Sequence, residues 1–297
     1  MKLWWNGTII DETEAVIPIT DHGFLYGMGL FETFRTYGGK PFLLDRHVER
    51  LRAGCEELRI SYEPDASEIG TAIAEALRAN GLTDGYVRWS VSAGAAPLGL
   101  PSPAGYGAPN VAVMAKSLGT GAPAPKELHV LRLPRNGPEG GVVRRKSFHY
   151  MNNVLGKWEL AERTASPSAE GLFVDAQGFL AEGIVSNVFW VADGALYTPS
   201  LDTGCLPGIT RDVVLELARE AGLPVVEGRF AWETLLAADE AFVTNSVQEL
   251  TPVGVLYDTA GSERKRWAPE AGPVTERLRQ SYRKLTGIEG SHTDDHS

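Results

Sequence analysis

A stretch without any periodic apolar pattern divides this 297-residue chain near its middle. Ser117 to Pro125 reads Ser-Leu-Gly-Thr-Gly-Ala-Pro-Ala-Pro, and such glycines and prolines are typical of a connection between domains. A chain of this length can bury two ordinary cores, and its 43% hydrophobic and 22% charged residues are normal for a globular protein. The sequence therefore predicts two domains, residues 1–118 and 127–286, with a linker at 119–126 and a disordered tail at 287–297.

Turn signals and apolar periodicity predict strands and helices in the first half. Asn6-Gly7 favours a tight hairpin turn, and Asp45 is a candidate N-cap for a helix from Arg46 to Leu58. Further expected elements are a helix at Ala66 to Ala79 and strands at Phe31 to Arg35, Tyr86 to Val91 and Val111 to Ala115. On the first of these strands, Thr33 and Arg35 would share a face. Before it, three glycines within seven residues would let the backbone approach another group closely.

The second half is predicted to contain hairpins and helices. Asp175-Ala176-Gln177-Gly178 and Asp193-Gly194 each lie between two apolar runs, as hairpin turns do. A helix is expected from Asp212 to Gly222, with Thr210 as its cap. Another begins at Tyr150, and helical spacing predicts that its apolar face consists of Met151, Val154, Leu155, Trp158 and Ala161.

Composition excludes several classes of function. The formal net charge of −10 argues against a nucleic-acid partner, because binding phosphates requires a basic face. Cys55 and Cys205 lie far apart without metal-ligand spacing, so we expect neither a zinc site nor a disulfide framework. Acidic residues follow Met1 too soon for a secretory core, and no apolar run is long enough to span a bilayer. The expectation is a cytoplasmic protein with reduced thiols that binds no metal and no membrane.

Lys146 is the centre of the functional argument. It follows Arg144 and Arg145 at a predicted strand-to-helix junction. An amine does covalent chemistry only when it is partly deprotonated, and neighbouring positive charge or desolvation lowers its pKa enough for that. The two arginines could supply such charge. Alternatively, the basic triplet is a solvated surface run.

Other residues make the chemical interpretation more specific. Glu182 lies between the two predicted hairpins, Thr210 opens a helix, and Ser246 lies in a short polar loop, while Arg50 is available from the first half. Pyridoxal phosphate requires such a set: a lysine for its aldehyde, a carboxylate for its pyridine nitrogen, and an arginine, hydroxyls and a helix start for its phosphate. The residues therefore predict this cofactor.

Competing motifs are weaker. Gly140 to Ser147 nearly matches the phosphate loop GxxxxGK[ST], but Arg145 occupies the place of the second glycine. No GxGxxG follows a strand and no GxSxG occurs. A nucleotide triphosphatase, a dinucleotide enzyme and an α/β-hydrolase are therefore disfavoured.

Several motifs together resemble the fold-type IV pyridoxal-phosphate family, which includes branched-chain aminotransferases, D-amino-acid aminotransferases and 4-amino-4-deoxychorismate lyases. They are Asp21 to Gly27 with Phe31 to Arg35, His47 to Leu51, Lys146 to Asn153, Ala181 to Phe189, Tyr197 to Pro199, Leu206 to Arg211 and Ala238 to Glu240. The resemblance covers roughly residues 2 to 285. It implies an α/β (α+β) protein with the two-domain D-amino-acid aminotransferase-like fold, in which a small N-terminal α/β domain precedes a larger C-terminal domain with a β-barrel-like core.

The resemblance also implies roles for individual residues. Lys146 would form the Schiff base with pyridoxal 5'-phosphate, and Glu182 would bind the pyridine nitrogen. Tyr150 would contact the ring hydroxyl. The phosphate would be held by Arg50, Ile209, Thr210 and Ser246. The protein would be a homodimer, with its active site between the domains and near the dimer interface.

Within the family, the chain resembles the bacterial aminodeoxychorismate lyases most. Thr33 matches the threonine that these lyases are thought to use in proton transfer, where branched-chain enzymes carry glycine. The implied reaction converts 4-amino-4-deoxychorismate into 4-aminobenzoate and pyruvate, a step toward folate. Arg35 and Arg88 are candidates for the substrate carboxylates, because a dicarboxylate requires local cations. Tyr26 is a further candidate substrate residue. Either arginine could instead pair with a structural acid.

Two other functions remain open at this point. The same cofactor cage could serve a branched-chain or D-amino-acid aminotransferase. A protein of another class, a non-catalytic pyridoxal-phosphate carrier or a cofactor-free binding protein, would leave Lys146 without a catalytic role.

Overall fold

The structure, a computed structural model, describes residues 1–101, 103–119, 121, 123–137, 143–268 and 270–287. The chain forms two compact units, Met1–Thr120 with Arg145–His149, and Gly121–Arg144 with Tyr150–Ser297. The predicted range 127–286 differs from this division at Arg145–His149, because that segment pairs with a strand of the first unit. Residues 120 and 122 of the predicted linker, and residues 288–297 of the predicted tail, lie outside the described residues.

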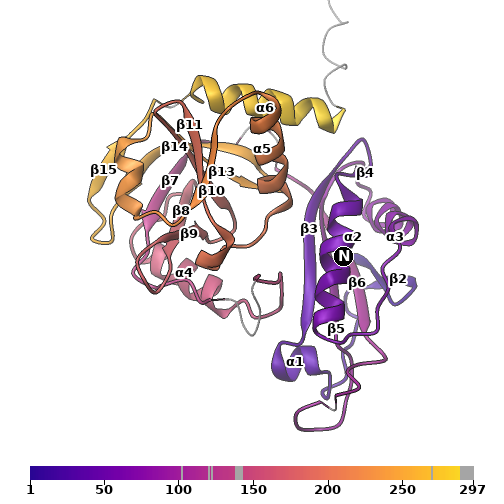
Figure 1. Cartoon of the computed structure of the whole chain (residues 1–297). Coiled ribbons are helices and arrows are strands. Elements are labelled where there is room, and N and C mark those ends of the chain that lie inside the picture. The colour runs from indigo at the N-terminus through magenta and orange to yellow at the C-terminus, as the bar shows by residue number, and fades with distance from the viewer. Residues whose placement is uncertain (102, 120, 122, 138–142, 269, 288–297) are drawn as a thin grey trace, which may run out of the picture. The chain divides into compact units, whose positions relative to one another are not determined.

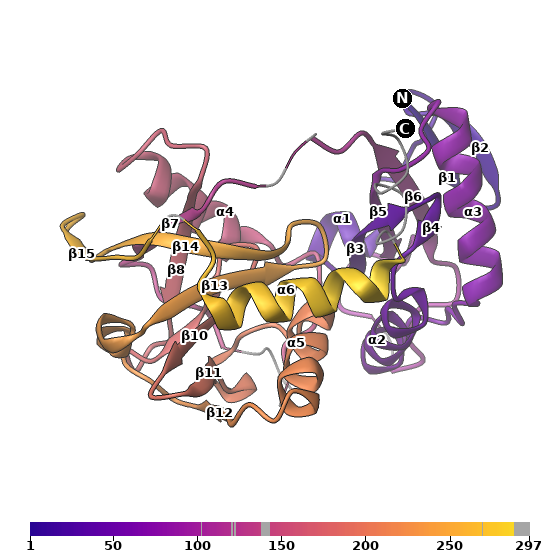
Figure 2. The same cartoon turned by 90° about the horizontal axis from the view of Figure 1, so that it is seen from above.

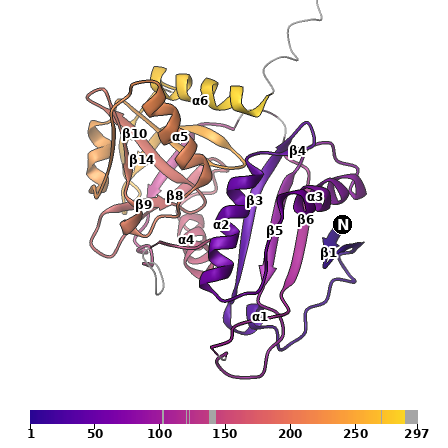
Figure 3. The same ribbon diagram turned by 45° about the vertical axis from the view of Figure 1, so that its right-hand side comes forward.

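The first unit is built on an antiparallel sheet with the strand order β2-β1-β6-β5-β3-β4. Figure 3 shows helices α2 and α3 on one side of these strands, where α2 contacts β3 and α3 contacts β1 and β6. The elements are β1 Lys2–Trp5, β2 Thr8–Asp11, α1 His22–Tyr26, β3 Gly29–Tyr37, β4 Lys40–Pro41, α2 Leu44–Glu57, α3 Ala66–Ala79, β5 Tyr86–Ser92 and β6 Asn110–Lys116.

The helices of the first unit cover a core of apolar residues from β3, β5 and β6. The predicted bounds of α3 are confirmed, and Asp65 caps it by accepting from the backbone N–H groups of Ser67 and Glu68. The prediction that Asp45 caps α2 is wrong. The N-cap is Leu43, in a left-handed conformation without a side-chain cap, and Asp45 lies in the first turn, where its charge favours the helix dipole.

The second unit contains a mixed sheet with the strand order β12-β11-β10-β13-β14-β7-β8-β9, and β15 pairs with β14. Figure 1 shows that this sheet curls, and Figure 2 shows α6 running beside β13 and β14. Apolar side chains of its strands form the core of the unit. The strands are β7 Lys126–Val130, β8 Ala169–Val174, β9 Leu180–Gly183, β10 Asn187–Ala192, β11 Ala195–Pro199, β12 Val225–Gly228, β13 Glu240–Asn245, β14 Glu249–Tyr257 and β15 Glu263–Arg266. The helices are α4 Met151–Ala161, η1 Leu201–Thr203, α5 Ile209–Glu220, η2 Trp232–Ala237 and α6 Pro273–Thr286.

Both predicted hairpins of the second unit are confirmed. Strands β8 and β9 pair antiparallel across the turn at Asp175 to Gly178, and β10 pairs with β11 across Asp193-Gly194. Asp193 and Gly194 both have positive φ angles, which the turn type requires. Among the described residues, no helix is both long and apolar enough to cross a membrane.

The predicted apolar face of α4 is the exposed face of the helix. Met151 and Trp158 are 74% and 63% exposed within this single chain, and the buried positions are Asn153, Gly156 and Leu160. A Cβ at position 156 would lie 2.5 Å from the Phe173 ring, so the absence of a side chain brings this face of the helix close to the sheet. The helix therefore turns its most apolar stripe outward.

Candidate active site

Lys146 belongs to the first unit, where its segment extends the sheet at the edge of β3. Leu30 and Ser147 form an antiparallel bridge, and the Phe31 N–H donates to the Lys146 carbonyl at 2.9 Å. Residues opposite each other on paired strands point to the same face of a sheet, so Lys146 shares a face with Phe31. Its Nζ lies 4.7 Å from the centre of the Phe31 ring.

The glycine-rich segment before β3 accommodates the chain around Lys146. A Cβ at Gly29 would lie 2.4 Å from the Phe148 ring, and one at Gly27 would lie 2.4 Å from His149. The predicted close approach of backbone to another group is thus confirmed, and that group is the segment that follows Lys146. Tyr26, at the end of α1, belongs to the same region: its hydroxyl accepts from Gly99 N at 3.2 Å.

Apart from Tyr26 on α1, the predicted catalytic and substrate residues of the first unit lie on one face of its sheet. Thr33 and Arg35 alternate with buried residues along β3, as expected, and share the face of Lys146. Thr33 is paired in register with Arg88 on β5. The Arg88 guanidinium carbon lies 3.7 Å from the centre of the Phe31 ring, and its Nε donates to Ser90 at 3.2 Å. Among the residues that the structure describes, Arg88 forms no ion pair with a carboxylate, so the alternative of a structural acid finds no support there.

Arg50 is held by a buried carboxylate on the opposite face of the sheet. Its Nε and Nη2 donate to the two Glu32 oxygens at 2.8 and 2.5 Å, and His47 Nδ1 lies 2.6 Å from Glu32. Burial opposes the ionisation of Glu32, but the Arg50 charge and the His47 hydrogen bond hold its pKa at about 2. Burial also lowers the pKa of His47, although Glu32 acts in the opposite direction. This pairing fixes the orientation of the predicted phosphate-binding arginine.

The two arginines before Lys146 have separate acidic partners. Arg145 Nε lies 2.5 Å from Glu57 Oε2 within the first unit, and Arg144 contacts Glu182 within the second. The positive charge that the sequence predicted beside the lysine is therefore offset by two carboxylates. Arg144 is thus bound to a carboxylate of the second unit and Arg145 to one of the first.

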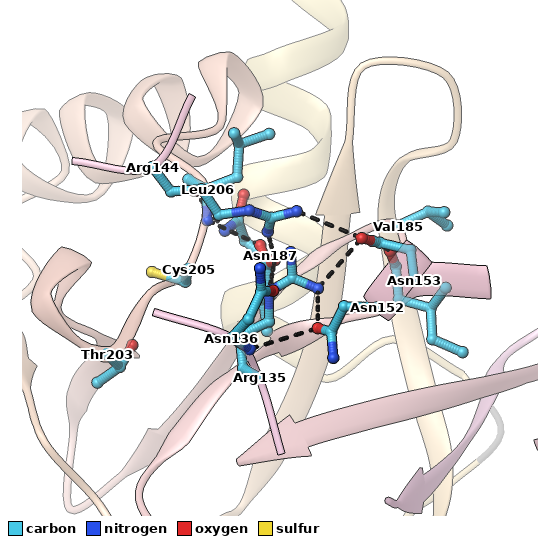
Figure 4. A network of polar contacts seen from close by, with 12 residues as sticks. Arg135, Asn136, Arg144, Asn152, Asn153, Val185, Asn187, Thr203, Cys205 and Leu206 are labelled. Carbon is cyan, nitrogen blue, oxygen red and sulfur yellow. Dashed lines mark hydrogen bonds and ion pairs between the residues drawn. The ribbon is translucent and has the colours of Figure 1, made fainter. Parts of the chain in front are cut away.

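Glu182, on β9, is the centre of a polar network in the second unit. Figure 4 shows Arg135, Arg144 and Asn153, which belong to this network. The Glu182 Oε1 atom contacts Arg144 and forms an ion pair with Arg135, whose Nε lies 3.2 Å away without an aligned hydrogen bond. The Oε2 atom accepts a hydrogen bond from Leu206 N at 2.8 Å. Both guanidinium groups also reach Asn153 Oδ1, at 3.2 and 3.3 Å. Two cations and a backbone donor thus stabilise one buried carboxylate.

Helix α5 begins with the residues that were predicted to hold a phosphate. Thr210 Oγ1 lies 3.4 Å from Ser246 Oγ, so the predicted hydroxyls are close together. The prediction that Thr210 caps this helix is wrong, because the N-cap is Gly208 and Ile209 and Thr210 form the first turn. A Cβ at Gly208 would lie 2.1 Å from Asn187 Oδ1. The first backbone N–H groups of a helix lack intrahelical partners, so this end can bind an anion.

The sequence analysis assigned no role to three residues of this region. Arg135 and Asn153 belong to the Glu182 network, and Asn187 donates to Leu206 O at 2.9 Å beside it. The only available signal was the Asn152-Asn153 pair at the helix after Lys146, because Arg135 lies in a Pro- and Gly-rich loop. Tyr150 immediately precedes α4, at its N-cap position.

Comparisons with known proteins identify the family. A sequence profile described as amino-transferase class IV matches residues 29–256. The chain is 41% identical over 285 residues to the aminodeoxychorismate lyase of Bacillus subtilis strain 168, covering 95% of this chain and 94% of that protein. It is 34% identical to the branched-chain-amino-acid aminotransferase of Pseudomonas aeruginosa PAO1, with 94% and 91% covered. The solved branched-chain aminotransferase of Thermoproteus uzoniensis, with norvaline, has a TM-score of 0.83 and 30% identity, covering 98% of this chain and 96% of that one.

The side chains described above fit the cofactor of this family. The first unit offers an amine at Lys146, and the second offers a buried carboxylate at Glu182 and hydroxyls at the start of α5. These are the groups that an aldehyde, a pyridine nitrogen and a phosphate require. The expected mixed α/β fold, with two domains and a curled half-barrel sheet, is confirmed by the solved relatives, one of which holds pyridoxamine 5'-phosphate. This chain belongs to the class IV aminotransferase family of pyridoxal-phosphate-dependent proteins.

Proposed function

We propose that this protein is an aminodeoxychorismate lyase, which converts 4-amino-4-deoxychorismate into 4-aminobenzoate and pyruvate. The observation that carries the proposal is the 41% identity, over 95% of the chain, to the Bacillus subtilis protein of that name. Thr33 supports it from the sequence, since this residue sits where the resemblance places the threonine of the lyases.

Lys146, Thr33 and Glu182 would each have a separate role in the reaction. When bound, pyridoxal phosphate supplies an electron sink for the pair of electrons left by a departing proton. Lys146 would release the cofactor to the substrate amine and take the proton from the ring carbon beside the nitrogen. Thr33, on the same sheet face, would pass a proton to the departing group, and Glu182 would hold the proton on the cofactor's ring nitrogen.

The remaining candidates would bind the charged parts of the ligands. Arg50, Ile209, Thr210 and Ser246 would hold the cofactor phosphate, and Tyr150 its ring hydroxyl. Arg88 and Arg35 would meet substrate carboxylates, and Tyr26 would contact the substrate from α1. Arg88 has no carboxylate partner among the described residues, which supports its part in this set, because a cation facing an aromatic ring remains able to bind an anion.

A side-by-side product assay tests the proposal. Purified holoenzyme is incubated with 4-amino-4-deoxychorismate and, separately, with D-alanine, D-glutamate or L-leucine. The lyase predicts equimolar 4-aminobenzoate and pyruvate from the first substrate only. Lys146→Ala should abolish the release, whereas Lys157→Ala, at an exposed position on α4, should leave it unchanged. Formation of keto acid and aminated cofactor, with no 4-aminobenzoate, would contradict the proposal.

An aminotransferase is the second candidate function. The 34% identity to the Pseudomonas aeruginosa enzyme and the TM-score of 0.83 to the Thermoproteus uzoniensis enzyme favour it. In the same assay it predicts keto acid from one of the amino acids. A non-catalytic carrier predicts neither product, although the cofactor would remain bound.

We also infer that the protein is a homodimer. The apolar stripe of α4, defined by Met151, Val154, Leu155 and Trp158, is exposed in the single chain. A contiguous exposed apolar surface is unfavourable in water, and association of two copies would bury it.

A further inference from the structure

The Phe31 ring lies between two cationic side chains on one face of the first unit's sheet. Across one edge of β3 its neighbour is Lys146, because Leu30 and Ser147 are bridged. Across the other edge its register partner on β5 is Ser90, and Arg88 is the diagonal neighbour on the same face. The Lys146 Nζ lies 4.7 Å and the Arg88 guanidinium carbon 3.7 Å from the ring centre.

Such an arrangement stabilises two charges that would otherwise repel each other. The face of an aromatic ring carries negative potential and attracts a cation within about 6 Å of its centre. Phe31 is only 3% exposed, and burial strengthens an electrostatic contact because water screens it less. The Phe148 ring lies beside it, with the two ring centres 6.5 Å apart.

We propose that Phe31 is a positioning residue, whose ring holds the Lys146 amine and the Arg88 guanidinium at fixed places on this sheet face. An anionic group of the substrate that binds Arg88 would then lie beside the amine. The inference rests on the proposed function for this last step, which requires an amine substrate with a carboxylate. The holding of Lys146 by the ring does not depend on the reaction.

Other charged groups of the first unit also act on Lys146. Arg145 immediately precedes it but is paired with Glu57. The Glu32, His47 and Arg50 cluster lies on the other face of β3, and the charge of Lys146 contributes to the lowered pKa of His47. The variants below leave all of these groups in place, so they isolate the ring and Arg88.

The test measures the protonation of Lys146 in the protein after its cofactor has been removed. The rate at which an amine reagent labels Lys146 is followed against pH by peptide mapping. The midpoint of this pH profile is the pH at which half of the Lys146 amine is deprotonated. Replacing the ring in Phe31→Leu should lower this midpoint by about 0.5 to 1 pH unit, because a cation–π contact favours the ammonium form. Arg88→Gln removes a positive charge that disfavours the ammonium form, so it should raise the midpoint. Phe31→Tyr keeps the aromatic ring and should leave the midpoint unchanged.

A second series guards against misfolding of the leucine variant. Phenylalanines with increasing ring fluorination at position 31 keep the shape but weaken the negative ring face, so the midpoint should fall stepwise. Equal midpoints across the fluorinated series would overturn the inference. So would an Arg88→Gln shift in the downward direction.

Binding of benzoate tests the Arg88 half without any reaction. Its affinity for the holoenzyme should weaken in Phe31→Leu and Arg88→Gln and persist in Phe31→Tyr, whereas unchanged affinity in the first two would contradict the placement of an anion at Arg88. Neither measurement requires turnover. Failure of the lyase assay and failure of this inference are therefore distinguishable.

Discussion

The Arg135 guanidinium lies 3.2 Å from the Glu182 carboxylate, and the two side chains are 0% and 5% exposed. Such a pair is costly to bury, and it contributes to a stable fold only when further hydrogen bonds satisfy both partners. Arg135 is satisfied in part, because its Nη1 donates to Asn152 and Asn153 at 2.7 and 3.2 Å, while its buried Nε and Nη2 make no hydrogen bond within the described part of the chain. The network fixes the carboxylate that we assign to the cofactor ring.

Removal of Arg135 should therefore destabilise the protein strongly. For Arg135→Met we expect a loss of about 3 to 5 kcal/mol in the free energy of unfolding of the cofactor-free protein, because Glu182 keeps a buried charge with one partner fewer. Urea unfolding measures it. The control is Arg132→Gln, which removes a 66% exposed arginine from its ion pair with Glu159 and should cost at most about 1 kcal/mol. Equal effects of the two changes would refute this account of the network.

Thr33 offers a test of proton transfer. Thr33→Ala should reduce lyase turnover by roughly 100-fold or more, which is the usual contribution of a positioned acid or base. Thr33→Ser retains the hydroxyl and should keep most of the activity. Absorbance of the bound cofactor should be unchanged in both variants, since the proposal gives Thr33 no part in cofactor binding. Full activity of the alanine variant would rule out this role.

The Glu32 cluster predicts a loss of stability in acid. The pKa of Glu32 is about 2 in the folded protein and 4.5 in an exposed carboxyl, so the unfolded chain binds the proton first. The contribution is therefore present above pH 4.5 and is lost as the pH falls toward about 2, amounting to about 3 kcal/mol. His47 adds to this loss of stability below pH 6.5, the ordinary pKa of histidine. Burial lowers the pKa of His47 in the folded protein, so the unfolded chain binds this proton first as well.

Urea unfolding at a series of pH values measures this effect. In Glu32→Gln the protein should be less stable at pH 7, because Arg50 loses the Glu32 carboxylate, and its stability should depend less on pH between 4.5 and about 2. A slope as steep as that of the unchanged protein would show that other carboxylates dominate the acid response.

The apolar stripe of α4 predicts the oligomeric state. Trp158→Glu, at the 63% exposed C-terminal end of the stripe, should convert a dimer into a monomer in sedimentation experiments, because a charge would be buried at the interface. Leu98→Glu changes an exposed leucine of the first unit, 79% exposed, and should leave the dimer intact. A monomeric unchanged protein would contradict the inference directly.

Local chemistry explains which elements could be predicted from the sequence. The Asn6-Gly7 and Asp193-Gly194 turns and the bounds of α3 follow from backbone preferences and caps that act over a few residues. Helix α6 was not predicted, although Pro273 at its start and the spacing of Leu278 and Tyr282 were available signals.

Tertiary contacts explain the rest. Periodicity identified the apolar stripe of α4 but not what covers it, and the face with Asn153 and Gly156 packs against the sheet instead. Arg135 could not be predicted, since its partner Glu182 is distant in the sequence. By contrast, side chains alternate between the two faces of a strand, and this alternation was enough to predict that Thr33 and Arg35 share a face.

Borohydride reduction of the holoenzyme, followed by peptide mapping, tests the assignment of the cofactor-bearing residue most directly. Reduction makes the bond between cofactor and lysine permanent, so the modified residue can be identified by mass. The account predicts the added mass on the peptide that contains Lys146 and on no other. A modified Lys157, or an unmodified Lys146 in protein that retains its cofactor, would contradict it.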